Sequence, residues 1–491
     1  MGCEHPSLLL GPCSNADTVG YKRPTAKQRH SATLLSTPRT RKRGDEAEAE
    51  AEAVEAMKAT CTFPGPLILP GDDLSEDPKY PAQSLRQWTR LKERNAVTRE
   101  RGAIYIVEPP LLEEDDDVNE LMKGWAHPGG VVKGKGKGKP VPRPAFDDVK
   151  DYVAAFYHGM AVKSLRTGSH LRFTSWDGEP AQKRSKSTKS STTPVIPPYI
   201  GLSTSQECIR IRSRPSSDNV FPAQLNLDDL LDAAISILPD DAYALLLLVD
   251  HDLYEDEDDL FVCGRAYGGS RVAVVSTARY HPVLDAVHDV ERVHAWPASH
   301  CEAYVRGYCE KVDGSSKKSK RAKSNLRRTV DPAIMEESPT PVGPMAKAIH
   351  AHNSLPLLIP SSSHSNLTGA WLARICRTAT HELGHCFGID HCIYYACAMQ
   401  GSSSLAEDAR QPPYLCPVDL AKLLCATGAD ADSRYHALLG YCRRHSDSVH
   451  LFAAYEAWIE AQLLKGRLDR LPLTAMATSP SFVELSTSGS T

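Results

Sequence analysis

The segment from 381 to 391 holds residues whose types and spacing could bind and use a metal ion. His381 and His385 are four residues apart, so on a helix their imidazoles would project from one face about one turn apart. Two imidazoles placed in this way can share one zinc ion at about 2.0–2.1 Å. Glu382 adjoins the first of them and suits a general base that takes a proton from a water molecule at the metal. The pattern predicts zinc-assisted hydrolysis of a peptide bond.

A third histidine makes chance a poor explanation of this pattern. Gly388 follows His385 by three residues, and glycine can adopt a positive φ, end the helix and turn the chain. The turn would bring His391 back toward the metal as a third ligand. Three protein ligands leave a fourth position open for water, which is the arrangement of a catalytic zinc site. A bare His-Glu-x-x-His arises by chance on amphipathic helices, but this extension adds two independent requirements.

Sulfur-containing residues follow the third histidine closely. They are Cys392, Cys397, Met399 and Cys416. Soft thiolates suit zinc, so a second, structural zinc ion would explain the cysteines. Cys376 and Cys386, on or beside the predicted helix, are more simply interpreted as packing residues.

These residues together resemble the archaemetzincins, a family of zinc metallopeptidases of the metzincin clan. The family pattern is His-Glu-x-x-His-x-x-Gly-x-x-His/Asn-Cys, then x4-Cys-x-Met, then a late Cys-x-x-Cys. The matching residues are His381, Glu382, His385, Gly388, His391, Cys392, Cys397, Met399 and Cys416. The resemblance covers roughly residues 104–428, interrupted by insertions, and implies that Met399 forms a Met-turn beneath the zinc site.

The chain departs from the family pattern at one position, because the last cysteine of the pattern falls at Asp419. A carboxylate can bind zinc through oxygen, so we predict Asp419 as the fourth ligand of the second zinc. Three alternatives stay open: Cys425 is the fourth ligand, Cys386 is the fourth ligand, or the second zinc is weakly bound or absent.

The elements that must position this site are predicted from hydrophobic periodicity. We expect the metal-binding helix over 367–387 with Asn366 as its N-cap, and further helices over 149–160 and 227–238, the latter capped by Asn226 and ended by Pro239. Strands are predicted at 104–107, 208–211, 244–249 and 271–278, and the apolar run 244–249 is typical of a strand buried on both faces. The resemblance makes 271–278 the candidate edge strand that pairs with an extended substrate.

The expected fold class is α/β (α+β): a metzincin-like catalytic domain with a small mixed sheet, an active-site helix and a Cys-rich C-terminal subdomain. The 491 residues include long Ser-, Lys- and Glu/Ala-rich stretches that bury little apolar surface. We therefore expect a mostly disordered N-terminal region (1–100), the catalytic domain (101–430) with disordered insertions at about 126–144, 180–196 and 312–345, C-terminal helices (431–470) and a disordered tail (471–491). The acidic stretch 251–259 lacks the spacing of a calcium loop and is expected to be a solvated loop.

Composition and charge limit the classes of binding partner that we expect for this chain. The net charge of −4 is not that of a basic nucleic-acid-binding chain, and no run of about 18 apolar residues predicts a membrane span. The start of the chain lacks the pattern of a signal peptide, so we expect an intracellular protein, cytoplasmic and/or nuclear. The expected partner is a peptide or protein substrate. Two rivals stay open: a zinc-binding protein without turnover, and a nucleic-acid-associated zinc protein in which the cysteines form a zinc knuckle and the lysine blocks bind phosphates.

Overall fold

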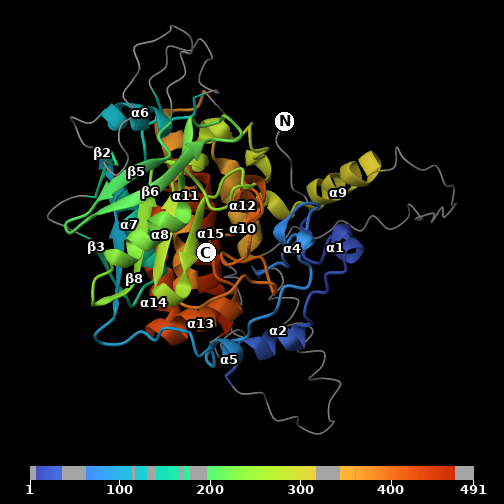
Figure 1. Ribbon diagram of the computed structural model, residues 1–491. Helices are drawn as coiled ribbons and strands as arrows, with labels where there is room; N and C mark the ends of the chain where they lie inside the picture. Colours follow the sequence, from blue (N-terminus) through green and yellow to red (C-terminus); the bar gives the residue numbers. More distant parts are fainter. Residues whose placement is uncertain are drawn as a thin grey trace, which may run out of the picture.

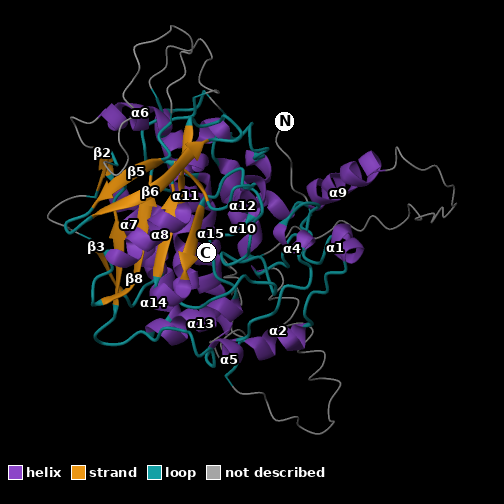
Figure 2. Cartoon of the chain, in the orientation of Figure 1, coloured by secondary structure: helices purple, strands orange, loops and turns teal. Residues whose placement is uncertain are grey.

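The computed structural model describes residues 7–35, 62–112, 117–129, 140–165, 171–176, 196–316, 343–359 and 361–469. Within these ranges the chain forms two β-sheets surrounded by helices, which confirms the predicted mixed α/β class. The strands gather on one side of the molecule, whereas α1 (Ser14–Val19), α4 (Asp73–Glu76) and α9 (Glu302–Ser316) lie on the other (Figures 1 and 2). None of the described helices combines the length and the apolar character that crossing a bilayer requires.

The central sheet is parallel except at one edge. Its order is β10 (Gly264–Tyr267), β11 (Val272–Ser276), β8 (Ala242–Val249), β1 (Ala103–Val107) and β3 (Ala161–Ser164), and β10 alone runs antiparallel to its neighbour. As predicted, β8 is buried along its whole length. Because side chains alternate along a strand, Leu245 and Leu247 enter one hydrophobic core and Leu246 and Leu248 enter the other.

A second sheet covers one face of the central sheet. Its order is β2 (Leu111–Leu112), β4 (Arg172–Thr174), β5 (Tyr199–Ser203), β6 (Cys208–Pro215), β7 (Ala223–Asn226) and β9 (Asp252–Tyr254). Its side chains share a core with those of α8 (Leu227–Ser236) and with Leu245 and Leu247 of β8. The predicted N-cap of α8 is confirmed, since the Asn226 side chain accepts a hydrogen bond from the Asp229 N–H at 3.1 Å.

Helices fill the other face of the central sheet. They are α7 (Phe146–Phe156), α10 (Pro344–Ser354), α11 (His364–Cys386), α13 (Pro417–Thr427), α14 (Ala431–Arg443) and α15 (His450–Asp469). One continuous core joins all six to β8. Leu405 of the short helix α12 (Leu405–Arg410) is part of the same core. Helix α6 (Asp117–Trp125) lies against β2 and β4 of the second sheet. Short 3₁₀ turns lie at Gly268–Ser270, Ala278–Tyr280, Pro282–Leu284, Arg292–His294 and Ala298–His300.

The helix that carries His381 and His385, α11, begins earlier than predicted. Its N-cap is Ser363, whose hydroxyl accepts a hydrogen bond from the Asn366 N–H at 3.2 Å. The prediction of Asn366 as the cap is therefore wrong. Both residue types are good caps, and the earlier one adds a turn to α11.

The N-terminal region differs from the predicted disorder over 7–35 and 62–100. These residues include α1, α2 (Ala26–Ala32), α4 and α5 (Leu85–Trp88). Ile68 and Leu69 are fully buried in a core shared with Val305 of α9, and the Trp88 Nε1–H donates to the Phe387 carbonyl at 2.9 Å. The apolar residues of this region have no helical or strand period and are buried against one another and against distant elements, so sequence patterns did not reveal them.

The acidic stretch 251–259 differs from its prediction as a solvated loop only in its first part, since residues 256–258 are exposed. His251 and Asp252 are buried, and β9 begins at Asp252. The buried Arg279 guanidinium donates from Nε to Asp252 Oδ1 at 2.8 Å. The ion pair makes burial of this carboxylate tolerable.

The predicted edge strand is internal. Residues 272–276 form β11, which lies between β10 and β8. The edge strand next to β11 is β10, which the sequence analysis did not predict because 255–271 is rich in Asp, Glu and Gly. The assignment of a substrate-pairing edge to 271–278 is therefore wrong.

The remaining domain predictions are tested little by the structure. The tail 471–491 and most of the insertions predicted at about 126–144, 180–196 and 312–345 lie outside the described residues. Within 431–470, α14 and α15 pack against each other, and their side chains continue the core around β8.

Candidate metal centres

The end of α11 and the turn after it position three histidines. The helix ends with hydrogen bonds from the Phe387 and Ile389 N–H groups to the Gly384 carbonyl, at 3.0 and 3.2 Å. Gly388 has φ +71°, the left-handed conformation that only glycine adopts without strain, so its predicted structural role fits the observed turn. The chain then returns, and His391 comes beside His381 and His385.

The three imidazoles converge. His381 Nε2 and His385 Nε2 lie 3.1 Å apart, and the His391 ring lies 5.3 and 5.1 Å from the two other rings between centroids. One ligand nitrogen from each histidine lies within 4.8 Å of the others. Two ligands at 2.0–2.1 Å from a tetrahedral metal would be about 3.3 Å apart, close to the observed separation.

Hydrogen bonds set the tautomers of two of the histidines. The Nδ1–H of His381 donates to the Ala398 carbonyl at 2.7 Å, and that of His385 donates to the Ile389 carbonyl at 2.8 Å. Burial lowers the pKa of His385 to about 4 and that of His381 well below its usual value, so both rings are neutral. Their Nε2 lone pairs then face each other without a proton between them, which fits a shared cation.

Glu382 lies in the same cleft, on the side of β10. Burial raises the pKa of its carboxyl to about 8, and the positive charge of Arg265 acts in the opposite direction. A Cβ on Gly264 would come within 3.3 Å of Glu382 Cγ, so this glycine leaves room for the glutamate. A dication at the histidines would act on the carboxyl as Arg265 does.

Met399, predicted to form a Met-turn, packs against α11. Its side chain is fully buried, and a Cβ on Gly384 would overlap with Met399 Sδ. The Cys392 N–H donates to the Met399 carbonyl at 2.7 Å, which closes the loop between them. Gly384 is therefore needed for close packing on Met399, a requirement that the spacing of the motif alone did not reveal.

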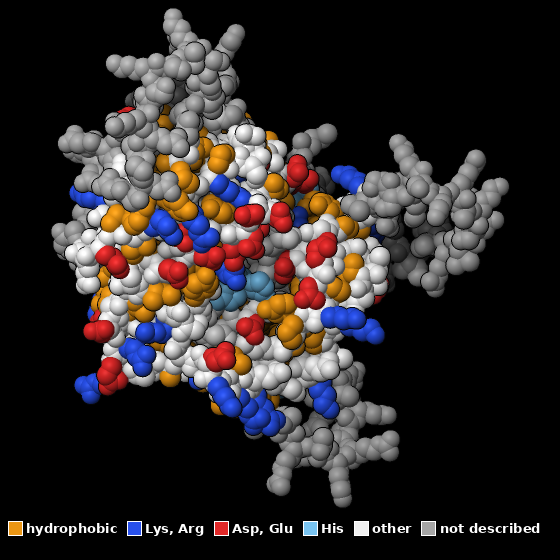
Figure 3. Space-filling model, viewed as in Figure 1, with side chains coloured by type: hydrophobic (Ala, Val, Ile, Leu, Met, Phe, Trp, Pro, Cys, Tyr) orange, Lys and Arg blue, Asp and Glu red, His pale blue; other side chains and the backbone are white. Residues whose placement is uncertain are grey.

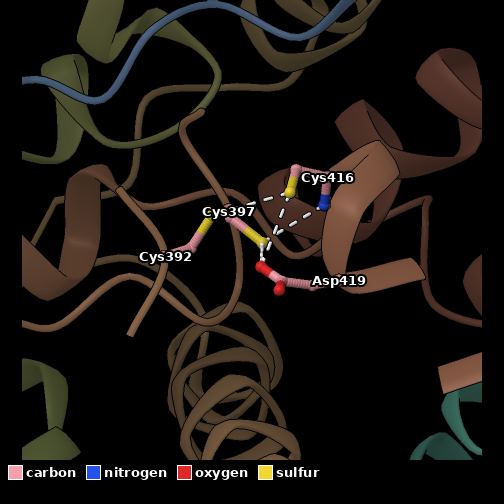
Figure 4. A group of neighbouring side chains, drawn as sticks. All are labelled: Cys392, Cys397, Cys416 and Asp419. Atoms are coloured by element: carbon pink, nitrogen blue, oxygen red, sulfur yellow. Dashed lines mark hydrogen bonds between the residues drawn. The ribbon is translucent and has the colours of Figure 1, made fainter. Parts of the chain in front are cut away.

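A second, buried group, here called the sulfur group, consists of Cys392, Cys397, Cys416 and Asp419 (Figure 4). Cys392 Sγ and Cys416 Sγ lie 3.6 Å apart, and Asp419 Oδ2 lies 3.2 Å from Cys397 Sγ and 3.5 Å from Cys416 Sγ. Thiolates about 2.3 Å from a tetrahedral zinc would be about 3.8 Å apart. The structure thus brings together the four residues predicted for the second site. Cys386 and the exposed Cys425 are not part of this group.

The charges of this group would suit a divalent cation. Burial raises the pKa of Asp419 to about 7 and holds the pKa of Cys397 and Cys416 well above the usual value. Burial opposes ionisation of Cys392 as well, but hydrogen bonds from the neighbouring thiols and carboxyl keep its pKa well below normal. The buried Lys422 contributes one positive charge, with Nζ 2.8 Å from Asp419 Oδ1. A divalent cation would supply the charge that lets all four groups ionise.

Gln83, from the N-terminal region, joins the two centres. Its Oε1 accepts a hydrogen bond from Lys422 Nζ at 2.8 Å, and its Nε2 donates to the Gly388 carbonyl at 3.0 Å and to Asp390 Oδ2 at 2.7 Å. Sequence reasoning missed this residue, because the contact joins distant parts of the chain and follows no local pattern.

The histidines line a cleft of about 900 Å³. Figure 3 shows histidine side chains, in pale blue, in a hollow of this face, with acidic side chains around it. Residues 264–266 of β10 form one wall, and Tyr80 and Arg94 come from the N-terminal region. Arg94 lies over the Trp88 ring at 4.2 Å and contacts the turn at Gly388. The N-terminal region therefore shapes the cleft, although no feature of its sequence predicts this.

A buried glutamate beside the cleft predicts a pH-dependent stability. Burial raises the pKa of Glu407 from its usual 4.5 to about 8, with the charge of Asp72 acting in the same direction. A raised carboxyl pKa means that the folded state binds the proton more tightly than the unfolded state. The stabilisation that the protonated Glu407 carboxyl gives to the fold is therefore fully present below pH 4.5 and is lost as the pH rises to about 8. We expect wild-type stability to fall more steeply between pH 5 and 9 than that of Glu407→Gln, measured by urea unfolding.

The comparison of the two proteins isolates this group, because every other titrating residue is common to both. The glutamine side chain of the variant would keep an oxygen for the Asp73 and Ser403 N–H groups, which now donate to Glu407 Oε2 at 2.9 and 2.8 Å. Parallel stability curves for the two proteins would contradict the prediction.

Comparison with known proteins finds similarity to one family of peptidases. Residues 361–424 match the model of peptidase family M54. Human Archaemetzincin-2 is 29% identical over 223 residues, which are 45% of this chain and 48% of that protein, and human Archaemetzincin-1 is 27% identical over 230 residues, 47% and 36% of the two chains. The archaemetzincin crystal structure from Methanopyrus kandleri aligns with 68% of this chain and 99% of its own, at 18% identity and a TM-score of 0.28.

The matched region contains every residue of both groups. The resemblance to the archaemetzincins that the motif predicts is thereby confirmed. The chain spans about half the length of the Archaemetzincin-2 proteins that it matches.

Proposed function

We propose that this chain, whose residues 361–424 match peptidase family M54 and which resembles the archaemetzincins, is a zinc-dependent peptidase. The observation that carries the proposal is the set of three converging histidines beside Glu382, at the bottom of a cleft with a sheet edge as one wall. The test is the cleavage of a peptide library by the wild type and by Glu382→Ala, with the zinc content of both proteins measured.

The residues present fit one catalytic zinc. His381, His385 and His391 would hold the ion, which when bound would act as a Lewis acid on the scissile carbonyl and the attacking water. Glu382 accepts the proton of that water and passes it to the leaving amine. Its burial raises the proton affinity of the carboxyl, which favours its holding the proton between these two transfers.

The second group fits a structural zinc. Its four residues are buried, offer three sulfurs and one oxygen, and leave no open position for a substrate. Lys422 offsets part of the negative charge of three thiolates and a carboxylate. Its ion pair with Asp419 suits a carboxylate at this position, where the family pattern has a cysteine. The proposed role of this zinc is to hold the loop 392–416 that carries Met399.

The substrate is proposed to bind as an added strand on β10. Ser276 N–H donates to the Cys263 carbonyl at 2.8 Å, and Gly264 pairs with Val275. Since hydrogen-bonded and non-hydrogen-bonded pairs alternate in an antiparallel ladder, Gly264 and Ala266 present their N–H and C=O groups away from β11. Both residues line the cleft, so an extended peptide could pair with them beside Glu382.

Replacing Ala266 with proline tests this role of β10. Proline is tolerated on an edge strand where the N–H points outward, but it removes that donor. Loss of one substrate hydrogen bond, worth about 1–1.5 kcal/mol, would lower kcat/KM for peptide cleavage about tenfold. Steady-state kinetics with Ala266→Ser as the matched control would measure this. A folded proline variant with wild-type kcat/KM would rule out pairing at Ala266.

A zinc-binding protein without turnover is the second candidate function. A complete set of histidines together with Glu382 argues against it, since a site that only binds zinc does not need a buried carboxyl beside the ligands.

A further inference from the structure

The third histidine faces a carboxylate from the N-terminal region. Asp73, the first residue of α4, places Oδ2 3.9 Å from His391 Nδ1. The Asp73 side chain is about one third exposed, so most of it packs against neighbouring groups. Asp73 lies outside the segment that matches peptidase family M54, whereas His391 lies within it.

The structure holds Asp73 at this place. Its backbone N–H donates to Glu407 Oε2 at 2.9 Å, and the same oxygen accepts from the Ser403 N–H at 2.8 Å. The preceding residue, Asp72, forms a buried ion pair with Arg410 of α12. This hydrogen bond and this ion pair hold Asp73 and Asp72 against α12, which follows Met399 in the chain.

Gly401 provides the room for the contact. A Cβ at this position would overlap with Asp73 Oδ2 and lie 2.6 Å from His391 Nδ1. These separations are shorter than any van der Waals contact, so a side chain at 401 would push the two groups away. The carboxylate can approach the imidazole only because residue 401 is a glycine.

The other two histidines show what such a contact does. His381 and His385 each direct Nδ1–H to a backbone carbonyl at 2.7–2.8 Å, which leaves Nε2 for a metal. Within the described residues His391 has no such hydrogen bond from Nδ1, and Asp73 occupies the corresponding place. A move of about 1 Å, or one intervening water, would complete the hydrogen bond.

We propose that Asp73 is a positioning residue for the catalytic centre. Its carboxylate accepts the Nδ1–H of His391, directly or through one water, and so orients the ring and directs Nε2 to the zinc. The inference rests on the proposed function, because it presumes zinc at the three histidines. It makes the N-terminal region a contributor to zinc affinity.

The test measures zinc affinity in the full-length chain by competition with a chelator. Asp73→Ala should weaken binding at the three histidines about 10- to 100-fold, the usual effect of losing a carboxylate behind a ligand histidine, and Asp73→Asn should lie between. Glu76→Ala, an exposed acidic residue on the same helix, is the matched control and should stay within about twofold. Binding of Co²⁺ distinguishes the centres, because thiolate charge-transfer bands arise only from the sulfur group.

Gly401→Ala provides a second variant that acts on the same contact. It should also weaken zinc binding, and combining it with Asp73→Ala should cost less than the product of the two effects, since both remove one interaction. The melting temperature of the metal-free protein should be the same for Asp73→Ala and Glu76→Ala. Wild-type zinc affinity in Asp73→Ala would overturn the inference. A wild-type protein that binds no zinc at the three histidines would instead overturn the proposed function.

Discussion

Replacing Glu382 with glutamine or alanine is expected to lower kcat/KM for peptide hydrolysis by about 10²- to 10⁴-fold, the range attributed to a positioned general base. Glutamine keeps the shape of the side chain but cannot take up the proton of the attacking water. Zinc content should stay at the wild-type value, because Glu382 is not part of the group of three histidines that would hold the ion. Initial-rate kinetics on a peptide identified by library cleavage, together with metal analysis, measure both quantities.

The matched control for this experiment is an exposed glutamate. Glu207 lies in the turn between β5 and β6, and Glu207→Gln should leave both activity and zinc content unchanged. Equal cleavage by the wild type and by Glu382→Ala would refute the peptidase proposal, because the cleavage would then come from a contaminant or from another group. Zinc binding without any cleavage in the wild type would favour the binding-protein alternative.

Replacing Cys416 with serine is expected to remove about one zinc ion per chain and to destabilise the fold by on the order of 3–5 kcal/mol. Without the metal, the remaining thiols, Asp419 and Lys422 would form a buried polar group with incomplete charge compensation. Cys416 is also the N-cap residue of α13 but makes no side-chain cap hydrogen bond, so the expected loss of stability comes from the metal and not from the cap. Metal analysis and urea unfolding of the purified protein measure the two effects.

Two further cysteine variants decide which residues form the second centre. Cys425→Ser, in the exposed part of the same helix, should keep the full zinc content, and its loss of zinc would revive the alternative that Cys425 is the fourth ligand. Asp419→Cys restores the cysteine of the family pattern and should tighten zinc binding, since a fourth thiolate suits zinc better than a carboxylate. Unchanged zinc content in Cys416→Ser would show that the group holds no metal.

The sequence alone determined the parts of this protein that depend on local spacing. Residues four apart on one helix share a face whatever surrounds them, so His381 and His385 could be paired without a structure. Gly388 marked the turn, and the continuous apolar run of β8 marked a strand buried on both faces. The spacing of the cysteines also singled out Cys392, Cys397 and Cys416, the resemblance to the family pattern pointed to Asp419, and the structure brings these four residues together.

Only the tertiary structure decided which distant segments meet at the site. The edge of the sheet is β10 rather than β11, because strand order depends on packing and not on the sequence of a single strand. Asp73 and Gln83 reach the centre from a region without periodic hydrophobic pattern, and Lys422 gains its importance only from burial beside Asp419. Such contacts leave no local signal, because their energy comes from groups that are far apart in the chain and become neighbours only once the core has formed.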